Sequence, residues 1–225
     1  AGAHGRAAAG RPVRLVAVSK TKPAAAVAAA LAAGQAIFGE NYVQELLDKA
    51  PEVSADARWH FIGKLQSNKA RKLVTSVPNL EAIETVDSAA LADKLAAAAV
   101  AAGRGAGGRP ALDAYVQVDT SGEASKGGVP PEEAPALAAH LVARCAPGLR
   151  FAGLMTIGAP GDAGAFDALV AAREAVAREL RVPAEEVGLS MGMSGDFEEA
   201  IRRGATSVRV GSQIFGGRAP KVSPG

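Results

Sequence analysis

Short apolar runs rich in β-branched residues alternate along this chain with stretches rich in alanine, leucine and charged residues. Runs of the first kind have the length and composition of strands, and stretches of the second kind have those of helices. Strands are expected at residues 13–19, 36–40, 59–63, 80–86, 112–120, 151–157, 187–191 and 207–215. Helices are expected near residues 24–33, 42–50, 67–74, 89–102, 132–145, 165–180 and 196–203.

Strict alternation of strands and helices is typical of parallel sheets whose strands are joined by helical crossovers. Eight such units favour a single closed (β/α)8 TIM barrel over an open, doubly wound α/β sheet. The open sheet is further disfavoured because neither a Gly-x-Gly-x-x-Gly fingerprint nor a Walker lysine follows the first strand. We expect one barrel domain at residues 13–217, a flexible remnant at 1–12 and a tail at 218–225.

Composition and charge narrow the class of protein. The net charge is only +2, and no basic stripe is interleaved with aromatic residues, so the sequence does not indicate a nucleic-acid partner. No apolar run approaches the roughly 18 to 20 residues that span a membrane.

Cysteine and histidine are both rare. The single cysteine, Cys145, excludes an internal disulfide and a multi-cysteine metal site, and it favours a reducing compartment such as the cytoplasm. We expect Cys145 to pack on a helix. The three histidines, His4, His60 and His140, are too dispersed in the sequence to predict a metal cluster.

Lys20 ends the first expected strand and is followed by Pro23. Val16, Val18 and Lys20 share one strand face by the two-residue period, which predicts an amine pointing inward at the mouth of the fold. Burial disfavours the charged form of an amine and makes the nucleophilic neutral form accessible, as a Schiff base with an aldehyde requires. The alternative is a lysine that extends from a strand end into solvent.

The end of the seventh strand carries small residues that suit a phosphate. Ser194 lies where a helix N-cap belongs, and Gly192 and Gly195 leave room beside it. In one interpretation Ser194 only caps the helix, and the Asp196 carboxylate interacts favourably with the positive end of the helix dipole. In the other, the free amides there bind a phosphate.

The eighth strand carries a charge inside an apolar run. Arg209 either faces solvent between helices or points inward, and we expect it inward because Gly211 and Ser212 follow it. Gly211 permits close backbone approach, and Ser212 offers both a hydroxyl and an amide. The loops after strands seven and eight are the usual phosphate site of this barrel. A reactive lysine opposite a phosphate site is what pyridoxal 5'-phosphate (PLP) requires.

Motifs throughout the chain carry a family resemblance. They are LVAVSKTKP at 15–23, FGENYVQE at 38–45, WHFIGKLQSNK at 59–69, GLMT at 153–156, LSMGMSGDFEEA at 189–200 and SVRVGSQIFG at 207–216. With them the chain resembles the pyridoxal phosphate homeostasis protein family, which is related to the fold-type III barrel of alanine racemase. The resemblance implies a barrel like the alanine racemase N-terminal domain. It also implies a helix before Arg11 that the opening residues do not match.

The resemblance also implies roles for individual residues. Lys20 would form the Schiff base, Arg209 would face the pyridine nitrogen, and Asn41 would contact the ring side of the cofactor. Ser194, Gly211 and Ser212 would hold the phosphate. Two further residues are left open: His60 either lines the site or packs in the core, and Lys126 either reaches the cofactor's edge or is solvated.

An arginine at the ring nitrogen bears on the type of activity. A permanently protonated guanidinium keeps that nitrogen unprotonated, so the ring is a poor electron sink and transamination or decarboxylation is not expected. A two-base racemase needs an acid or base on each substrate face, which alanine racemase takes from a further β-domain. The chain ends at Gly225, about ten residues after the last expected strand, and neither Tyr42 nor Tyr115 is an evident replacement.

We therefore expect a monomeric PLP-binding protein that holds PLP as a lysine Schiff base and takes part in intracellular vitamin B6 homeostasis and supply. Its partners would be PLP and apo forms of PLP-dependent enzymes, and it would have little or no catalysis of its own. The first alternative is a monodomain amino-acid racemase with weak activity. The second is a phosphate-binding barrel enzyme that uses Lys20 in an aldolase-like Schiff base.

Overall fold

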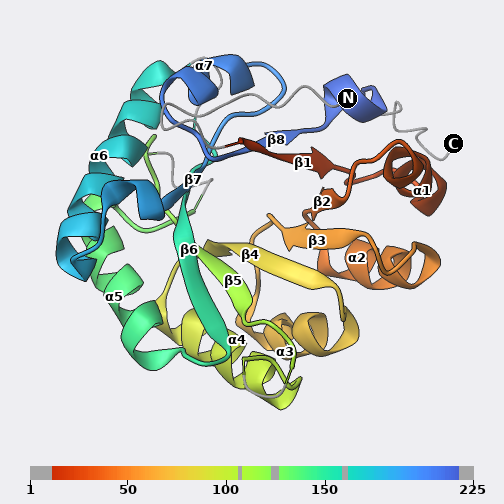
Figure 1. Ribbon diagram of the computed structural model, residues 1–225, viewed down its shortest axis with the longest axis horizontal. Helices are drawn as coiled ribbons and strands as arrows, with labels where there is room; N and C mark the ends of the chain where they lie inside the picture. Colours follow the sequence, from red (N-terminus) through yellow and green to blue (C-terminus); the bar gives the residue numbers. More distant parts are fainter. Residues whose placement is uncertain (1–11, 106–107, 123–126, 159–161, 218–225) are drawn as a thin grey trace, which may run out of the picture.

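The strands close into a parallel barrel. The computed structural model describes residues 12–105, 108–122, 127–158 and 162–217. Within these ranges the eight strands pair in sequence order, and β1 pairs with β8 to complete the ring (Figure 1). They are β1 Arg14–Val18, β2 Ile37–Glu40, β3 Arg58–Phe61, β4 Leu80–Val86, β5 Leu112–Gln117, β6 Leu149–Met155, β7 Gly188–Ser190 and β8 Ser207–Val210. The expected TIM barrel is confirmed.

Helices connect the strands and surround the barrel, as Figure 1 shows. They are α1 Ala24–Ala32, α2 Val43–Lys49, α3 Ser67–Ser76, α4 Ala89–Ala101, α5 Ala134–Arg144, α6 Ala163–Leu180, α7 Phe197–Arg202 and α8 Ser212–Phe215. Short 3-10 turns lie at Ala50–Glu52, Pro131–Glu133 and Ala184–Glu186. Among the described helices, none combines the length and the hydropathy needed to cross a bilayer.

The main apolar core lies between the strands and the surrounding helices. Phe38 on β2 and Trp59 on β3 are adjacent in register and fully buried, with ring centroids 5.7 Å apart. Inside the barrel, by contrast, lie buried polar groups that include His60, Glu84 and Arg209. The apolar layer supplies the burial that holds the barrel closed, while the interior carries the charges described below.

The eighth strand is shorter than expected. It ends at Val210, and the residues from Ser212 to Phe215 form α8. Gly211 (φ −120°, ψ −68°) takes the chain out of the extended conformation, and its carbonyl accepts from the amides of Ile214 and Phe215. The expected strand at 207–215 was wrong at its end. Ile214 and Phe215 are residue types common in strands, and composition alone does not locate the turn at Gly211 that ends the strand.

The expected terminal segments lie at the edge of what the structure describes. Apart from Pro12, the remnant at 1–12 falls outside the described residues, and so does the tail at 218–225. The domain boundaries therefore stay predictions.

Candidate functional site

All six predicted site residues line one cavity. It has a volume of about 340 Å³, and its lining includes Lys20, Asn41, Ser194, Arg209, Gly211 and Ser212. These residues follow β1, β2 and β7 or belong to β8 and its loop, so the cavity lies at the carboxyl ends of the strands. That is the end of the barrel where TIM-barrel proteins carry their sites, and the volume suits a small ligand.

The cavity is electropositive. Lys20, Lys22 and Arg209 line it, and no carboxylate does so among the described residues. Lys22 Nζ donates to the carbonyl of Gly217 at 2.8 Å, which ties this lysine to the loop after β8. Three basic side chains, in a lining that holds no carboxylate among the described residues, favour an anionic ligand.

Lys20 lies in a turn rather than at the end of the strand. β1 ends at Val18, the amide of Lys22 donates to the carbonyl of Ser19 at 3.0 Å, and Thr21 is left-handed with φ 63°. Lys20 is consequently half-buried at the cavity rather than buried. Val18 and Lys20 both line the cavity, so the amine lies at the mouth of the fold as expected, but it is less buried because the strand ends before it.

A buried ionic cluster anchors this turn. The Ser19 hydroxyl donates to Glu40 Oε1 at 2.6 Å, and Lys49 Nζ donates to the same oxygen at 2.5 Å. Lys49 Nζ also donates to Glu45 Oε1 at 2.8 Å and to the carbonyl of Ser19 at 2.9 Å. Three acceptors use all three donors of the Lys49 ammonium. Burial raises the pKa of Glu40 despite the opposing bonds from Lys49 and Ser19.

Sequence reasoning missed this cluster. Glu40 lies at the end of an apolar strand and Lys49 on the helix that follows it, so the available signal was a pair of opposite charges on neighbouring elements, both of which the structure buries.

Arg209 points into the barrel. Its Nη1 donates to Ser190 Oγ at 2.7 Å, and its Nη2 donates to the carbonyl of Thr156 at 2.7 Å. Nη1 also lies 4.0 Å from Glu84 Oε2 on β4, on the opposite side of the ring. Burial lowers the pKa of Arg209 while Glu84 and Asp196 raise it, and a guanidinium remains charged in such a site. The inward direction expected for this side chain is confirmed.

His60 lies beneath Arg209 and does not line the cavity. His60 Nδ1 is 2.5 Å from Glu84 Oε1, and the Ser190 hydroxyl donates to Glu84 Oε2 at 2.6 Å. Of the two interpretations left open for His60, the structure therefore supports a core histidine with a hydrogen bond. A polar column runs from His60 through Glu84 and Ser190 to Arg209.

Ser194 does not cap a helix. The N-cap of α7 is Asp196, whose carboxylate accepts from the amide of Met193 at 2.6 Å. Ser194 Oγ instead accepts from the amide of Gly211 at 3.1 Å, so it joins the loops after β7 and β8. The N-cap prediction failed because the helix begins later than the sequence pattern indicates. The Ser194 hydroxyl hydrogen has no assigned acceptor among the described residues.

The turn after β8 brings backbone amides to the cavity. A Cβ on Gly211 would lie 3.1 Å from the carbonyl oxygen of Val18, so glycine here permits close packing of β8 on β1. Ser212 opens α8, and amides in a first helical turn have no acceptor within the helix. The amides of Ser212 and Gln213 are thus suited to an external acceptor.

Asn41 contributes an unsatisfied group. Its Oδ1 is buried and has no hydrogen-bond partner, although the residue lines the cavity. A buried acceptor without a partner has a free-energy cost unless a ligand or water donates to it. The cavity therefore fits an anion that also carries a hydrogen-bond donor. Lys126 lies outside the described residues.

Comparisons with known proteins agree with this arrangement. Residues 4–219 match the family model described as alanine racemase, N-terminal domain. The chain is 51% identical over 216 residues to the pyridoxal phosphate homeostasis protein of Bos taurus, covering 91% of this chain and 77% of the relative. The human protein of the same name is 49% identical over 222 residues, covering 94% and 78%.

A solved structure of PipY from Synechococcus elongatus with PLP bound is 40% identical and has a TM-score of 0.74, covering 91% of this chain and 92% of PipY. With such relatives along nearly its whole length, the chain belongs to the pyridoxal phosphate homeostasis protein family.

Proposed function

We propose that this protein binds PLP in the cavity, holds it as a Schiff base on Lys20, and takes part in PLP homeostasis. PLP supplies an aldehyde that condenses with a primary amine, together with a dianionic phosphate. The observation that carries the proposal is a single cavity in which Lys20 and the loops after β7 and β8 meet, with Lys22 and Arg209 also in its lining. The relatives' name and the PLP-bound PipY structure support the same ligand.

Lys20 is favoured over the two neighbouring lysines as the reacting amine. Lys49 is buried, does not line the cavity, and has all its donors engaged by Glu40, Glu45 and Ser19. Lys22 also lines the cavity and donates to the carbonyl of Gly217, but only Lys20 directly follows the buried Ser19. The turn that carries Lys20 is anchored by the hydrogen bond from Ser19 to Glu40. This bond fixes the backbone from which the Lys20 side chain extends into the cavity.

The phosphate would be held by the loops after β7 and β8. The Ser194 hydroxyl and the amides of Ser212 and Gln213 are the donors proposed for it, with Gly211 allowing the turn. Each bond from such a donor to a charged oxygen contributes roughly 1.5 to 3 kcal/mol. Asn41 would accept from the ring side of the cofactor through its unpartnered Oδ1.

Arg209 would donate to the pyridine nitrogen. Its guanidinium is held by Ser190 and by the Thr156 carbonyl, which leaves further N–H groups for the ligand. Because a guanidinium does not give up its proton, the ring nitrogen stays unprotonated and carbanion chemistry is weakly supported. This role disfavours transamination and decarboxylation, while racemisation is judged by whether a second base is present.

The racemase alternative lacks an evident second base among the described residues. Tyr115 is buried, and burial together with Glu84 raises the pKa of its phenol. Tyr42 is 54% exposed, and neither tyrosine lines the cavity.

Three further points belong to the proposal. Apo forms of PLP-dependent enzymes would receive the cofactor, and the protein would be a monomer. It would act in the cytoplasm, because a chain with a single cysteine suits a reducing compartment.

A transfer assay tests the supply function. Holo-protein mixed with an apo-aminotransferase should restore aminotransferase activity while losing its own cofactor absorbance. In parallel, α-hydrogen exchange of L- and D-alanine in deuterium oxide should remain at the level of free PLP. Rapid exchange that depends on the protein, without transfer, would instead support the racemase.

A further inference from the structure

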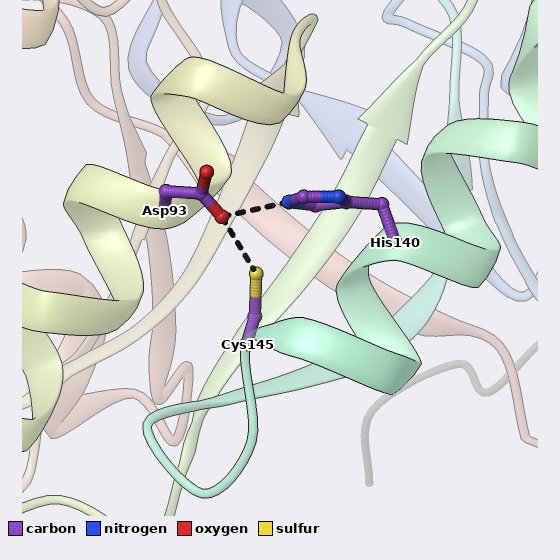
Figure 2. A group of neighbouring side chains, drawn as sticks. All are labelled: Asp93, His140 and Cys145. Atoms are coloured by element: carbon purple, nitrogen blue, oxygen red, sulfur yellow. Dashed lines mark hydrogen bonds and ion pairs between the residues drawn. The ribbon is translucent and has the colours of Figure 1, made fainter.

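A second cluster of reactive side chains lies on the outer helices. Asp93 on α4, His140 on α5 and Cys145 at the end of α5 converge between the two helices, as Figure 2 shows. His140 Nε2 is 2.7 Å from Asp93 Oδ1, and Cys145 Sγ is 3.9 Å from the same oxygen. None of the three lines the PLP cavity, and no role in PLP binding uses them.

The three ligand atoms have the spacing of a small metal site. A nitrogen, a sulfur and a carboxylate oxygen all lie within 4.8 Å of one another. In a tetrahedral zinc site with bonds of about 2.0 to 2.3 Å, neighbouring ligand atoms are about 3.3 to 3.7 Å apart. A shift of about an ångström in these side chains would therefore bring the three atoms around one ion.

The arrangement does not suit a cysteine nucleophile. Asp93 Oδ1 contacts both His140 Nε2 and Cys145 Sγ, so the hydrogen bond of each goes to the carboxylate and none is shown between the imidazole and the thiol. A catalytic cysteine needs a cation beside it to favour the thiolate.

A cation and a fourth ligand can reach the cluster. Asp93 is exposed, His140 is half-buried, and an open depression between the helices is lined by Asp93, Cys145 and Arg144. A water molecule from this side would complete four-coordination. One thiolate and one carboxylate would balance the charge of a divalent ion, and binding would release the thiol proton to solvent.

We propose that Asp93, His140 and Cys145 form a binding site for a borderline-soft divalent cation, zinc in the first place, separate from the PLP cavity. Cysteine with histidine selects zinc over magnesium and calcium, which prefer oxygen ligands. The ion would join α4 to α5 and stabilise the outer layer of the barrel. The spacing of histidines gave no sign of this site because Asp93 comes from a different helix.

The test is a zinc titration of the PLP-loaded full chain, followed by native mass spectrometry and by competition with a chromophoric chelator. We expect one zinc per chain in the unaltered protein, and tetrahedral visible absorption bands when cobalt replaces zinc. Cys145→Ser and His140→Gln should each weaken binding by more than about 100-fold, because loss of a ligand exceeds the effect of an outer-shell partner. Zinc should also raise the Tm of the unaltered protein, and it should leave the Tm of Cys145→Ser and His140→Gln unchanged.

Asp48→Asn is the matched control, since Asp48 is an exposed helical carboxylate that accepts from Gln44. It should leave zinc binding unchanged. His140 is half-buried, so the His140→Gln variant remains informative if Cys145→Ser unfolds. Unchanged zinc affinity in either folded variant, or no stoichiometric zinc in the unaltered protein, would overturn the proposal, whatever the outcome for PLP.

Discussion

At the residue scale, Arg209 depends on charges that lie deeper in the barrel. Glu84 is its nearest counter-charge, and Glu84 is shared with His60 and Ser190. A buried cation is tolerated only when such partners compensate for its lost hydration. The direction of Arg209 could be predicted from Gly211 and Ser212, but its partners could not, because Glu84 comes from the opposite strand.

The polar column from His60 to Arg209 predicts a pH dependence of stability at its His60 end. His60 is the largest cause of a lowered pKa of Glu81, to about 2, and Arg58 and Arg14 add to the effect. Glu81 and Glu84 raise the pKa of His60 more than its burial lowers it. The carboxylate therefore contributes stability above its unfolded pKa, and the imidazolium contributes stability below its own unfolded pKa.

We expect the free energy of unfolding to fall as pH drops from about 4.5 towards 2, as Glu81 takes up a proton. It should also fall as pH rises through the raised pKa of His60. Urea denaturation across pH measures both limbs. Glu81→Gln should flatten the acid limb, whereas exposed Glu132→Gln should not, and equal acid limbs in the two variants would contradict the assignment.

At the element scale, the strands could be predicted and their ends could not. Composition located all eight strands, but it extended β1 towards Lys20 and β8 through Phe215. Both ends are set by single turns with tertiary partners: Ser19 bonds to Glu40, and the amide of Gly211 bonds to Ser194. Ser194 therefore lines the cavity through its link to Gly211, and it is not the helix N-cap that the sequence pattern indicated.

The turn after β8 predicts a difference between two glycines. Gly211→Ala would press a methyl group against the Val18 carbonyl, so we expect a loss of about 1 to 3 kcal/mol in stability and weaker PLP retention. Gly195→Ala is the control, because nothing lies within 4 Å of its added Cβ. Equal thermal and PLP-binding behaviour of the two variants would argue against close packing of β8 on β1.

At the scale of the whole molecule, the barrel separates two kinds of chemistry. The carboxyl ends of β1, β2, β7 and β8 form a cationic cavity, and the outer helices α4 and α5 hold the Asp93–His140–Cys145 cluster. The cavity could be predicted because each of its motifs lies at the end of an expected strand. The second could not, because helix packing, rather than spacing along the chain, brings its members together.

The amine that holds PLP is the central claim, and borohydride reduction tests it directly. PLP-loaded protein is reduced, digested and mapped by mass spectrometry, beside Lys20→Ala and the matched cavity variant Lys22→Ala. We predict a single pyridoxyl adduct on Lys20, retained in Lys22→Ala and lost in Lys20→Ala. An adduct on Lys22 or Lys49, or undiminished trapping in Lys20→Ala, would contradict the account.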